Sequence, residues 1–234
     1  MRWRRISSSS PGRVGRWARS SEGREDIFTY GISVAVACLL RAYVVEPRYI
    51  PSESMLPTFR VGDQLAVEKV SRRGGRFLRR FQRDLRRGDV IVFRPPDRLA
   101  EVMEAEYGGH DTSGIGPNEA LIKRVVAVEG DRVRIARGGL YLNGRRQVEP
   151  YTNEPDRANY RYGPLVVPRG RVLCLGDNRN ASLDGHIWGT LPVENVIGRA
   201  IFVYWPPWRA SRKDGVAVSA AAAAAAAGSE EIYY

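Results

Sequence analysis

Two serines lie two residues apart between two prolines in the stretch 50–58, which reads IPSESMLPT. Proline fixes its own φ angle and biases the preceding residue toward extended backbone, so we expect a fixed, extended loop here. A serine held in such a loop can present its hydroxyl oxygen to a scissile carbonyl and act as a nucleophile. Serine and proline are also common in ordinary turns. Composition alone therefore leaves a catalytic serine and a simple turn as open alternatives.

A single lysine interrupts the apolar face of a predicted strand at 120–128. Because side chains alternate between the faces of a strand, Lys123 shares its face with Leu121, Val125 and Ala127. Burial disfavours a charged amine and can tune a catalytic lysine to a pKa of about 7–8, so that its neutral form can take a proton from a serine. The alternative is an edge lysine whose amine reaches solvent. Arg124, on the opposite face, is expected to be an ordinary cation.

A polar loop at 176–189, reading GDNRNASLDGHIWG, lies between two apolar strands. Aspartate, asparagine and serine stabilise turns through hydrogen bonds from side chain to backbone. Such a loop can also orient a catalytic group, and this pattern alone does not separate the two roles.

The elements that must position these groups begin with a predicted membrane anchor. Residues 1–25 are rich in serine, glycine and arginine and indicate a flexible tail. The 19 residues from Ile27 to Val45 contain one charge, Arg41, and nearly span a hydrocarbon core of about 30 Å. The basic tail places the N-terminus in the cytoplasm and the chain beyond Val45 outside. A removed signal sequence, with Ala35–Ala37 as its cleavage site, and a buried core helix are the alternatives.

Beyond Pro47 the pattern predicts an all-β domain of short strands. Glycine or proline punctuates most of the β-branched runs, which lie at 64–70, 89–93, 120–128, 132–135, 140–142, 165–167, 171–175 and 196–204. The pair Asn143-Gly144 predicts a tight hairpin turn. No alternation of strands and helices is visible, which argues against a parallel α/β fold.

The net charge of +11 fits either nucleic acid or an anionic lipid surface as a partner. Residues 1–24 hold seven of the arginines and one glutamate, and residues 72–87 hold eight more. The second run is interpreted as a solvated loop, with a contact to anionic lipid or to nucleic acid as the alternatives. No base-reading motif is present, so nucleic acid is not expected. The alanine run 220–227 is too short to span a membrane.

Five short segments, in order along the chain, resemble the conserved boxes of type I signal peptidases. Besides the serine loop, they are Gly62-Asp63 with Val67–Lys69, then 87–93, 122–125 and 176–179. The resemblance implies a membrane-bound serine endopeptidase with a Ser/Lys dyad on an all-β fold. Its substrates would be exported precursor proteins that carry signal peptides, cut after small residues in an Ala-x-Ala pattern. No metal or other cofactor is implied.

The same resemblance assigns roles by position. Ser54 corresponds to the nucleophile, and Lys123 to the general base. Ser52 corresponds to the serine whose hydroxyl forms the oxyanion hole with the Ser54 amide, and Ser182 to the serine that hydrogen-bonds the lysine amine. The polar loop also supplies three supporting residues: Asn178, Arg179 and Asp184.

One position departs from the family pattern. Many members have arginine at the position of His186, where it pairs with the aspartate equivalent to Asp184. Here we expect that ion pair to be absent or to use Arg179 instead.

The expected organisation is a cytoplasmic tail at 1–25, a transmembrane helix at 26–46, a β-rich peptidase domain at 47–208 and an alanine-rich tail at 209–234. A small inserted lobe occupies about 132–170. The protein is expected in the plasma membrane as a single-pass chain, with the catalytic domain outside and anionic phospholipid as a partner. Three other interpretations compete: a self-cleaving repressor, an inactive scaffold and a nucleic-acid binder. A repressor would need a DNA-binding helix-turn-helix, and the N-terminal part of this sequence offers a membrane segment instead. The intact serine and lysine argue against an inactive scaffold.

Overall fold

The computed structural model describes residues 21–69, 84–99, 101–102, 120–154 and 157–212. Most of the arginine run 72–87, the alanine run 220–227 and the tail 1–20 lie outside these residues. The chain divides into two compact units, Met1–Ala42 and Tyr43–Tyr234, which are described separately below.

The first unit contains one long helix, α2 (Ser21–Tyr43). Its segment Gly23–Tyr43 has a mean hydropathy of 1.3, and it is long and apolar enough to cross a membrane. The helix ends at Tyr43, three residues before the expected boundary, and strand β1 (Val45–Tyr49) begins almost at once. Pro47 explains why the helix does not continue to the expected end at 46, because a proline disfavours helical backbone at the residue before it and cannot donate a hydrogen bond to the carbonyl of Tyr43.

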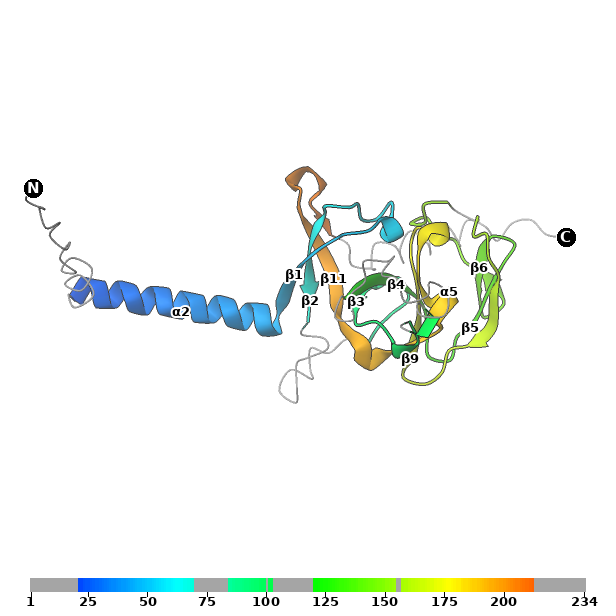
Figure 1. Ribbon diagram of the computed structural model, residues 1–234, viewed down its shortest axis with the longest axis horizontal. Coiled ribbons are helices and arrows are strands. Elements are labelled where there is room, and N and C mark those ends of the chain that lie inside the picture. The colour runs from blue at the N-terminus through cyan, green and yellow to red at the C-terminus, as the bar shows by residue number, and fades with distance from the viewer. Residues whose placement is uncertain (1–20, 70–83, 100, 103–119, 155–156, 213–234) are drawn as a thin grey trace, which may run out of the picture. The chain divides into compact units, whose positions relative to one another are not determined.

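The second unit is built on an eight-stranded antiparallel sheet (Figure 1). Along the sheet the strands run in the order β1, β2 (Gln64–Glu68), β11 (Val196–Trp205), β3 (Val90–Phe93), β4 (Leu121–Val128), β9 (Arg171–Leu175) and β10 (Leu191–Pro192), and β12 (Ser211–Arg212) pairs with β11. The predicted mainly β fold with one N-terminal apolar helix is therefore confirmed. Strand β1 was not expected, because its first residues continue the apolar run of the helix.

The segment between β4 and β9 forms a separate four-stranded sheet. Its order is β7 (Arg145–Arg146), β6 (Gly139–Leu142), β5 (Arg132–Ala136) and β8 (Tyr162–Val166). Asn143 and Gly144 join β6 to β7 with φ angles of 52° and 86°, which confirms the predicted tight turn. Arg137 and Gly138 make a second turn with positive φ, from β5 to β6, which the sequence pattern did not indicate.

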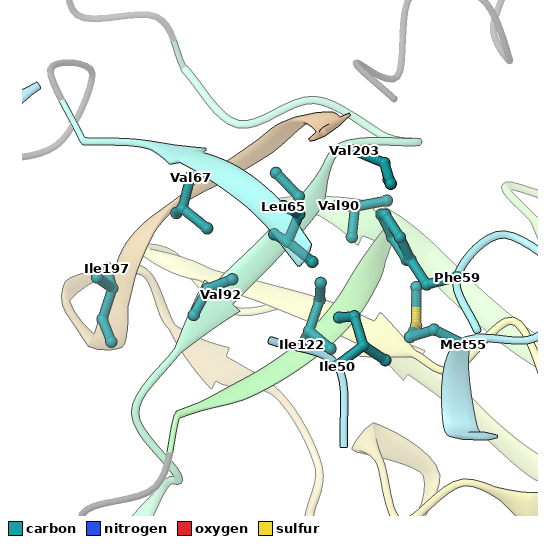
Figure 2. Packing of buried hydrophobic residues seen from close by; sticks show 11 residues of the cluster. Ile50, Met55, Phe59, Leu65, Val67, Val90, Val92, Ile122, Ile197 and Val203 are labelled. Carbon is teal, nitrogen blue, oxygen red and sulfur yellow. The ribbon is translucent and has the colours of Figure 1, made fainter. Parts of the chain in front are cut away.

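One apolar cluster packs the serine loop against the large sheet. Figure 2 shows Met55 and Phe59 of the loop beside side chains of β2, β3 and β11. Both residues are fully buried. Burying such side chains stabilises the folded state by about 1.5–3 kcal/mol each, so the loop is fixed by packing as well as by its prolines.

A second cluster joins the small sheet to β4 and β9. It combines apolar residues of the small sheet, such as Val133 and Leu140, with Ala127 of β4 and Leu173 of β9. The inserted lobe is thus packed on the strand that carries Lys123. Strand β4 is buried on both faces and has an irregular register between Val125 and Ala127. The expected strict alternation therefore holds only up to Val125, because a bulge changes the face on which later side chains lie.

Candidate active site

Ser54 lies in a single turn of 3₁₀-helix, η1 (Glu53–Met55), that follows β1. Its neighbour Met55 is buried in the apolar cluster, which fixes the turn from one side. Backbone hydrogen bonds fix the turn's own geometry: the amide of Leu56 donates to Glu53 and the amide of Phe59 to Met55. Ser54 is 7% exposed, so its hydroxyl is close to the surface but largely removed from water.

The polar loop 176–189 holds the turn from the other side. The backbone N–H of Asn178 donates to the Ser54 carbonyl at 3.1 Å, and its side-chain amide donates to the Glu53 carbonyl at 3.2 Å. A Cβ atom at Gly176 would lie 2.6 Å from the Ser54 carbonyl oxygen and 2.2 Å from the Ser182 hydroxyl oxygen. Only glycine allows this approach, so the loop and the serine turn fit closely.

Lys123 comes to this turn from β4, where it pairs with Ile91 of β3. Its amine lies 2.8 Å from the hydroxyl oxygen of Ser54, and its side chain is 4% exposed. The edge-lysine alternative is therefore excluded. Sixty-nine residues separate the two side chains in sequence, and the sheet brings them into hydrogen-bond contact.

Burial lowers the pKa of Lys123 from its ordinary value of 10.5 to about 8. Desolvation is the largest cause, and the negative charges of Asp184 and then Asp177 partly oppose it. A substantial fraction of the amine is therefore neutral slightly above neutral pH. A neutral amine at 2.8 Å can accept the hydroxyl proton of Ser54, which is the chemistry that activates a serine nucleophile.

Ser52 and Ser182 lie on two sides of Ser54. The hydroxyl oxygen of Ser52 is 3.3 Å from that of Ser54 and belongs to an exposed residue of extended backbone. Ser182 is 8% exposed, and its hydroxyl has no hydrogen-bond partner among the described residues. The expected hydrogen bond between Ser182 and the amine of Lys123 is thus not formed here, and the supporting role of Ser182 stays a prediction.

Asp184 lies at the base of the polar loop and is fully buried. Its carboxylate accepts the amide of Gly176 at 2.7 Å and caps the short helix α5 (Gly185–Trp188) through the amide of His186. It also lies 2.8 Å from Nδ1 of the His186 ring. Asp184 therefore pairs with His186, the residue that stands where many family members have arginine.

Arg179 does not replace the missing arginine. Its guanidinium forms a buried, bidentate ion pair with Glu149, whose oxygen Oε2 accepts from Nη1 at 2.7 Å, while Nε donates to the Gly176 carbonyl. Of the two alternatives for Asp184, pairing with Arg179 is not formed, because the small lobe supplies Glu149 as the carboxylate partner of Arg179. Glu149 lacked any signal in the sequence, since its contact depends on how the lobe packs.

Arg124 is the other residue whose role was missed. It is 1% exposed and binds Asp177 through Nε and Nη2, at 2.7 and 2.6 Å. Its guanidinium also stacks over the ring of Tyr151 at 4.1 Å. Arg124 was expected to be an ordinary cation, but it forms a buried ion pair that connects β4 to the polar loop. Two signals in the sequence could have indicated this role. Arg124 stands beside Lys123 in one recognised box, and Asp177 stands beside Gly176 in another.

The geometry fits that of a Ser/Lys hydrolase: a nearly buried serine, a desolvated lysine within hydrogen-bond distance, and a polar loop that fixes the serine turn. Among the described residues, no three His, Cys, Asp or Glu side chains gather in a way that could hold a metal ion.

Comparisons with known proteins agree with this class. Residues 24–205 match the family described as signal peptidase, peptidase S26. The chain is 42% identical over 182 residues to a signal peptidase I of Leptolyngbya laminosa, covering 78% of this chain and 79% of that protein. It is 41% identical over 191 residues to thylakoidal processing peptidase 1 of Arabidopsis thaliana, covering 82% of this chain but only 50% of that longer protein. A crystal structure of a signal peptidase I from Enterococcus faecalis overlaps 50% of this chain and 97% of its own, at 23% identity and a TM-score of 0.37.

The chain therefore belongs to the signal peptidase family, peptidase S26, and is a serine endopeptidase.

Proposed function

We propose that this protein removes signal peptides from exported precursor proteins, with Ser54 as nucleophile and Lys123 as general base. The observation that carries the proposal is the 2.8 Å contact between the buried amine of Lys123 and the Ser54 hydroxyl. The lowered pKa of that amine supports it, because the base must be neutral to act. Cleavage is proposed to follow a small residue, in an Ala-x-Ala pattern.

The proposed reaction has two halves. Neutral Lys123 takes the proton of Ser54, whose oxygen attacks the scissile carbonyl carbon. The hydroxyl of Ser52 and the amide of Ser54 stabilise the tetrahedral oxyanion, and one donor of this kind contributes about 3–4 kcal/mol. The charged lysine then gives its proton to the leaving amine. In the second half, Lys123 activates a water that hydrolyses the acyl-enzyme.

The remaining predicted site residues support this pair. Asn178 fixes the Ser54 turn through its two hydrogen bonds, and Arg179 holds the Gly176 carbonyl. Ser182 is proposed to bind the lysine amine during the reaction, because its hydroxyl lies near Ser54 with no partner among the described residues. Asp184 supports the loop through the amide of Gly176.

We also propose that the protein acts at a membrane surface. Helix α2 would anchor it, with the basic tail in the cytoplasm and the catalytic domain outside. Four aromatic side chains at the end of β11 and in the turn η5 (Pro207–Arg209) are exposed: Phe202, Tyr204, Trp205 and Trp208. Amphipathic rings favour the depth of lipid headgroups, so this cluster and the basic charge of the chain would contact anionic phospholipid.

The test uses the full chain in detergent with a labelled precursor, and the cut site is mapped by mass. Ser54→Ala and Lys123→Met are each expected to abolish cleavage and to leave the fold intact. Lys69→Met is the matched control, because Lys69 is also buried but pairs with Glu46 at 2.8 Å. Cleavage retained in either of the first two variants would contradict the assignment. A cut that does not follow a small residue would contradict the proposed specificity alone.

A further inference from the structure

The ring of His186 is held on two sides. Its Nδ1 lies 2.8 Å from a carboxylate oxygen of Asp184. Its face is stacked on the ring of Tyr160, with 3.8 Å between the ring centroids and 15° between the planes.

Asp184 connects this ring to the catalytic pair. It accepts the amide of Gly176, where an added Cβ atom would collide with Ser182 and the Ser54 carbonyl. Its charge also acts directly on the general base. After desolvation, which lowers the pKa of Lys123, the negative charge of Asp184 is the largest influence on that pKa and raises it.

We propose that His186 is a positioning residue that acts on Lys123 through Asp184, and that the charge on its ring controls how readily Lys123 gives up its proton. The inference rests on the proposed role of Lys123 as general base. A permanently charged arginine at this position would give the aspartate a constant partner. Histidine makes the partner titratable, because imidazole is the side chain whose charge normally changes between pH 5 and 8.

The direction of the effect follows from the charges. When the ring is protonated, its positive charge cancels part of the field of Asp184, and Lys123 loses its proton at lower pH. When the ring is neutral, the field of Asp184 acts undiminished and favours the charged amine. Loss of the histidine proton on raising the pH therefore opposes loss of the lysine proton.

Other ionisable groups pack against this pair from several elements. Burial raises the pKa of Tyr160, before β8, and of Cys174 in β9, and it also raises the pKa of Tyr162 in β8, so all three are neutral near pH 7. Two arginines contribute positive charge that stays constant at these pH values: Arg179, paired with Glu149, and Arg98, which faces Tyr162. Among these neighbours of Asp184, His186 carries the imidazole, the kind of side chain whose charge normally changes between pH 5 and 8.

The first test compares two variants with fixed charge. His186→Asn keeps a neutral donor at every pH, and His186→Arg keeps a positive charge that can still stack on Tyr160. The acid limb of the pH profile of kcat/KM is expected about 0.5–1 pH unit lower in His186→Arg than in His186→Asn. At pH 6.5 this corresponds to about a three- to ten-fold difference in rate. The wild-type limb is expected between the two and less steep than either.

A purely structural role gives a different result. If His186 only supports the loop, the variants lose activity by similar factors at every pH, and their acid limbs coincide. Coincident limbs would overturn the proposal.

The second test does not depend on activity or on folding of the His186 variants. The chain contains only two histidines, His110 and His186, so the ring signals can be followed by NMR in micelles and assigned with His110→Gln. Thermodynamic coupling is reciprocal. Replacing the charged amine by Lys123→Met is therefore expected to raise the midpoint of His186 by the same 0.5–1 pH unit or so. An unchanged midpoint would refute the coupling.

The two proposals can fail separately. If Ser54→Ala or Lys123→Met still cleaves the precursor, the catalytic assignment fails whatever the histidine signals show. If those variants are inactive while the acid limbs coincide and the midpoint of His186 does not move, the catalytic assignment stands and the role of His186 falls.

Discussion

Among single residues, Lys123 controls the chemistry, because burial removes its amine from water. Lys123 lies in β4, between the apolar strands β3 and β9. Its amine contacts the hydroxyl of Ser54. In water a lysine is almost fully charged at pH 7 and cannot serve as a base. Here burial brings its pKa to about 8, so a few per cent or more of the amine is neutral at physiological pH.

The pH profile of the wild-type enzyme should show this ionisation. Because only the neutral amine can accept the proton of Ser54, kcat/KM is expected to rise with pH up to a midpoint near 8 and then to level off. Below the midpoint the slope is at most tenfold per pH unit. A profile that is flat between pH 6 and 9 would contradict a lysine base.

The same ionisation affects stability, with a definite sign. The folded-state pKa of Lys123 is about 8 and the ordinary value is 10.5, so between them the unfolded chain binds more protons. The contribution of this group to the free energy of unfolding is therefore present above pH 10.5 and is lost as the pH falls to about 8. Lys123→Met lacks this dependence, so the difference between its melting curves and those of wild type across this range gives an independent check.

Some residues of the candidate site could be proposed from the sequence and others could not, for physical reasons. Ser54 and Lys123 stand in short boxes, and Asp184 in the polar loop 176–189, all with a local pattern that is visible along the chain. Glu149 and Tyr160 stand in the small lobe, and no local pattern marks them. Their contacts with Arg179 and His186 depend on how that lobe packs on β4 and β9, a long-range arrangement that spacing does not reveal.

Strands were predictable where one or both faces are apolar. Runs of β-branched residues correctly predicted β2, β3, β4, β5, β9 and β11 to within two residues at either end. The short strands β7, β10 and β12 have two residues each and present no pattern at all. The bulge in β4 was likewise invisible, because it arises from pairing with β9.

Two buried ion pairs connect the elements around the site. Arg124 of β4 binds Asp177, and Arg179 of the turn η3 (Arg179–Ala181) binds Glu149 of the small lobe. Such pairs contribute little net stability when complete, but an unpaired buried charge is costly. The pairs therefore fix where the polar loop lies relative to β4 and the lobe.

Removing one partner should expose this cost. Glu149→Gln leaves the guanidinium of Arg179 buried without its counter-ion, so the free energy of unfolding is expected to fall by about 3–5 kcal/mol. Glu154→Gln is the control, because Glu154 is exposed, and a change within about 0.5 kcal/mol is expected. Urea unfolding measures both.

A double variant tests the explanation itself. Glu149→Leu combined with Arg179→Met removes both charges, and it should be less destabilised than Glu149→Gln alone. Equal or greater loss in the double variant would show that the hydrogen bonds of Arg179, rather than its unpaired charge, carry the effect.

The whole molecule combines a β-rich catalytic unit with an apolar helix and a basic N-terminal tail. Helix α2 has 23 residues, about 35 Å at 1.5 Å per residue, which matches a hydrocarbon core of about 30 Å. Its apolar side chains, such as Phe28 and Val34, are more than 60% exposed to solvent in the isolated unit. A lipid environment would cover them. Confinement of enzyme and precursor to one surface would also raise their effective concentration.

Orientation in the membrane is the prediction that belongs to this scale. The seven arginines of residues 1–24 should remain in the cytoplasm, so the catalytic unit should face outward. In a chain with Cys38→Ser and Cys174→Ala, a single cysteine is placed at Ser8 or at the exposed Arg145. Intact cells are treated with a membrane-impermeant maleimide. Arg145→Cys should be labelled directly, and Ser8→Cys only after the membrane is permeabilised. The reverse pattern would place the active site in the cytoplasm, and equal labelling of both without permeabilisation would mean that the helix does not span the bilayer.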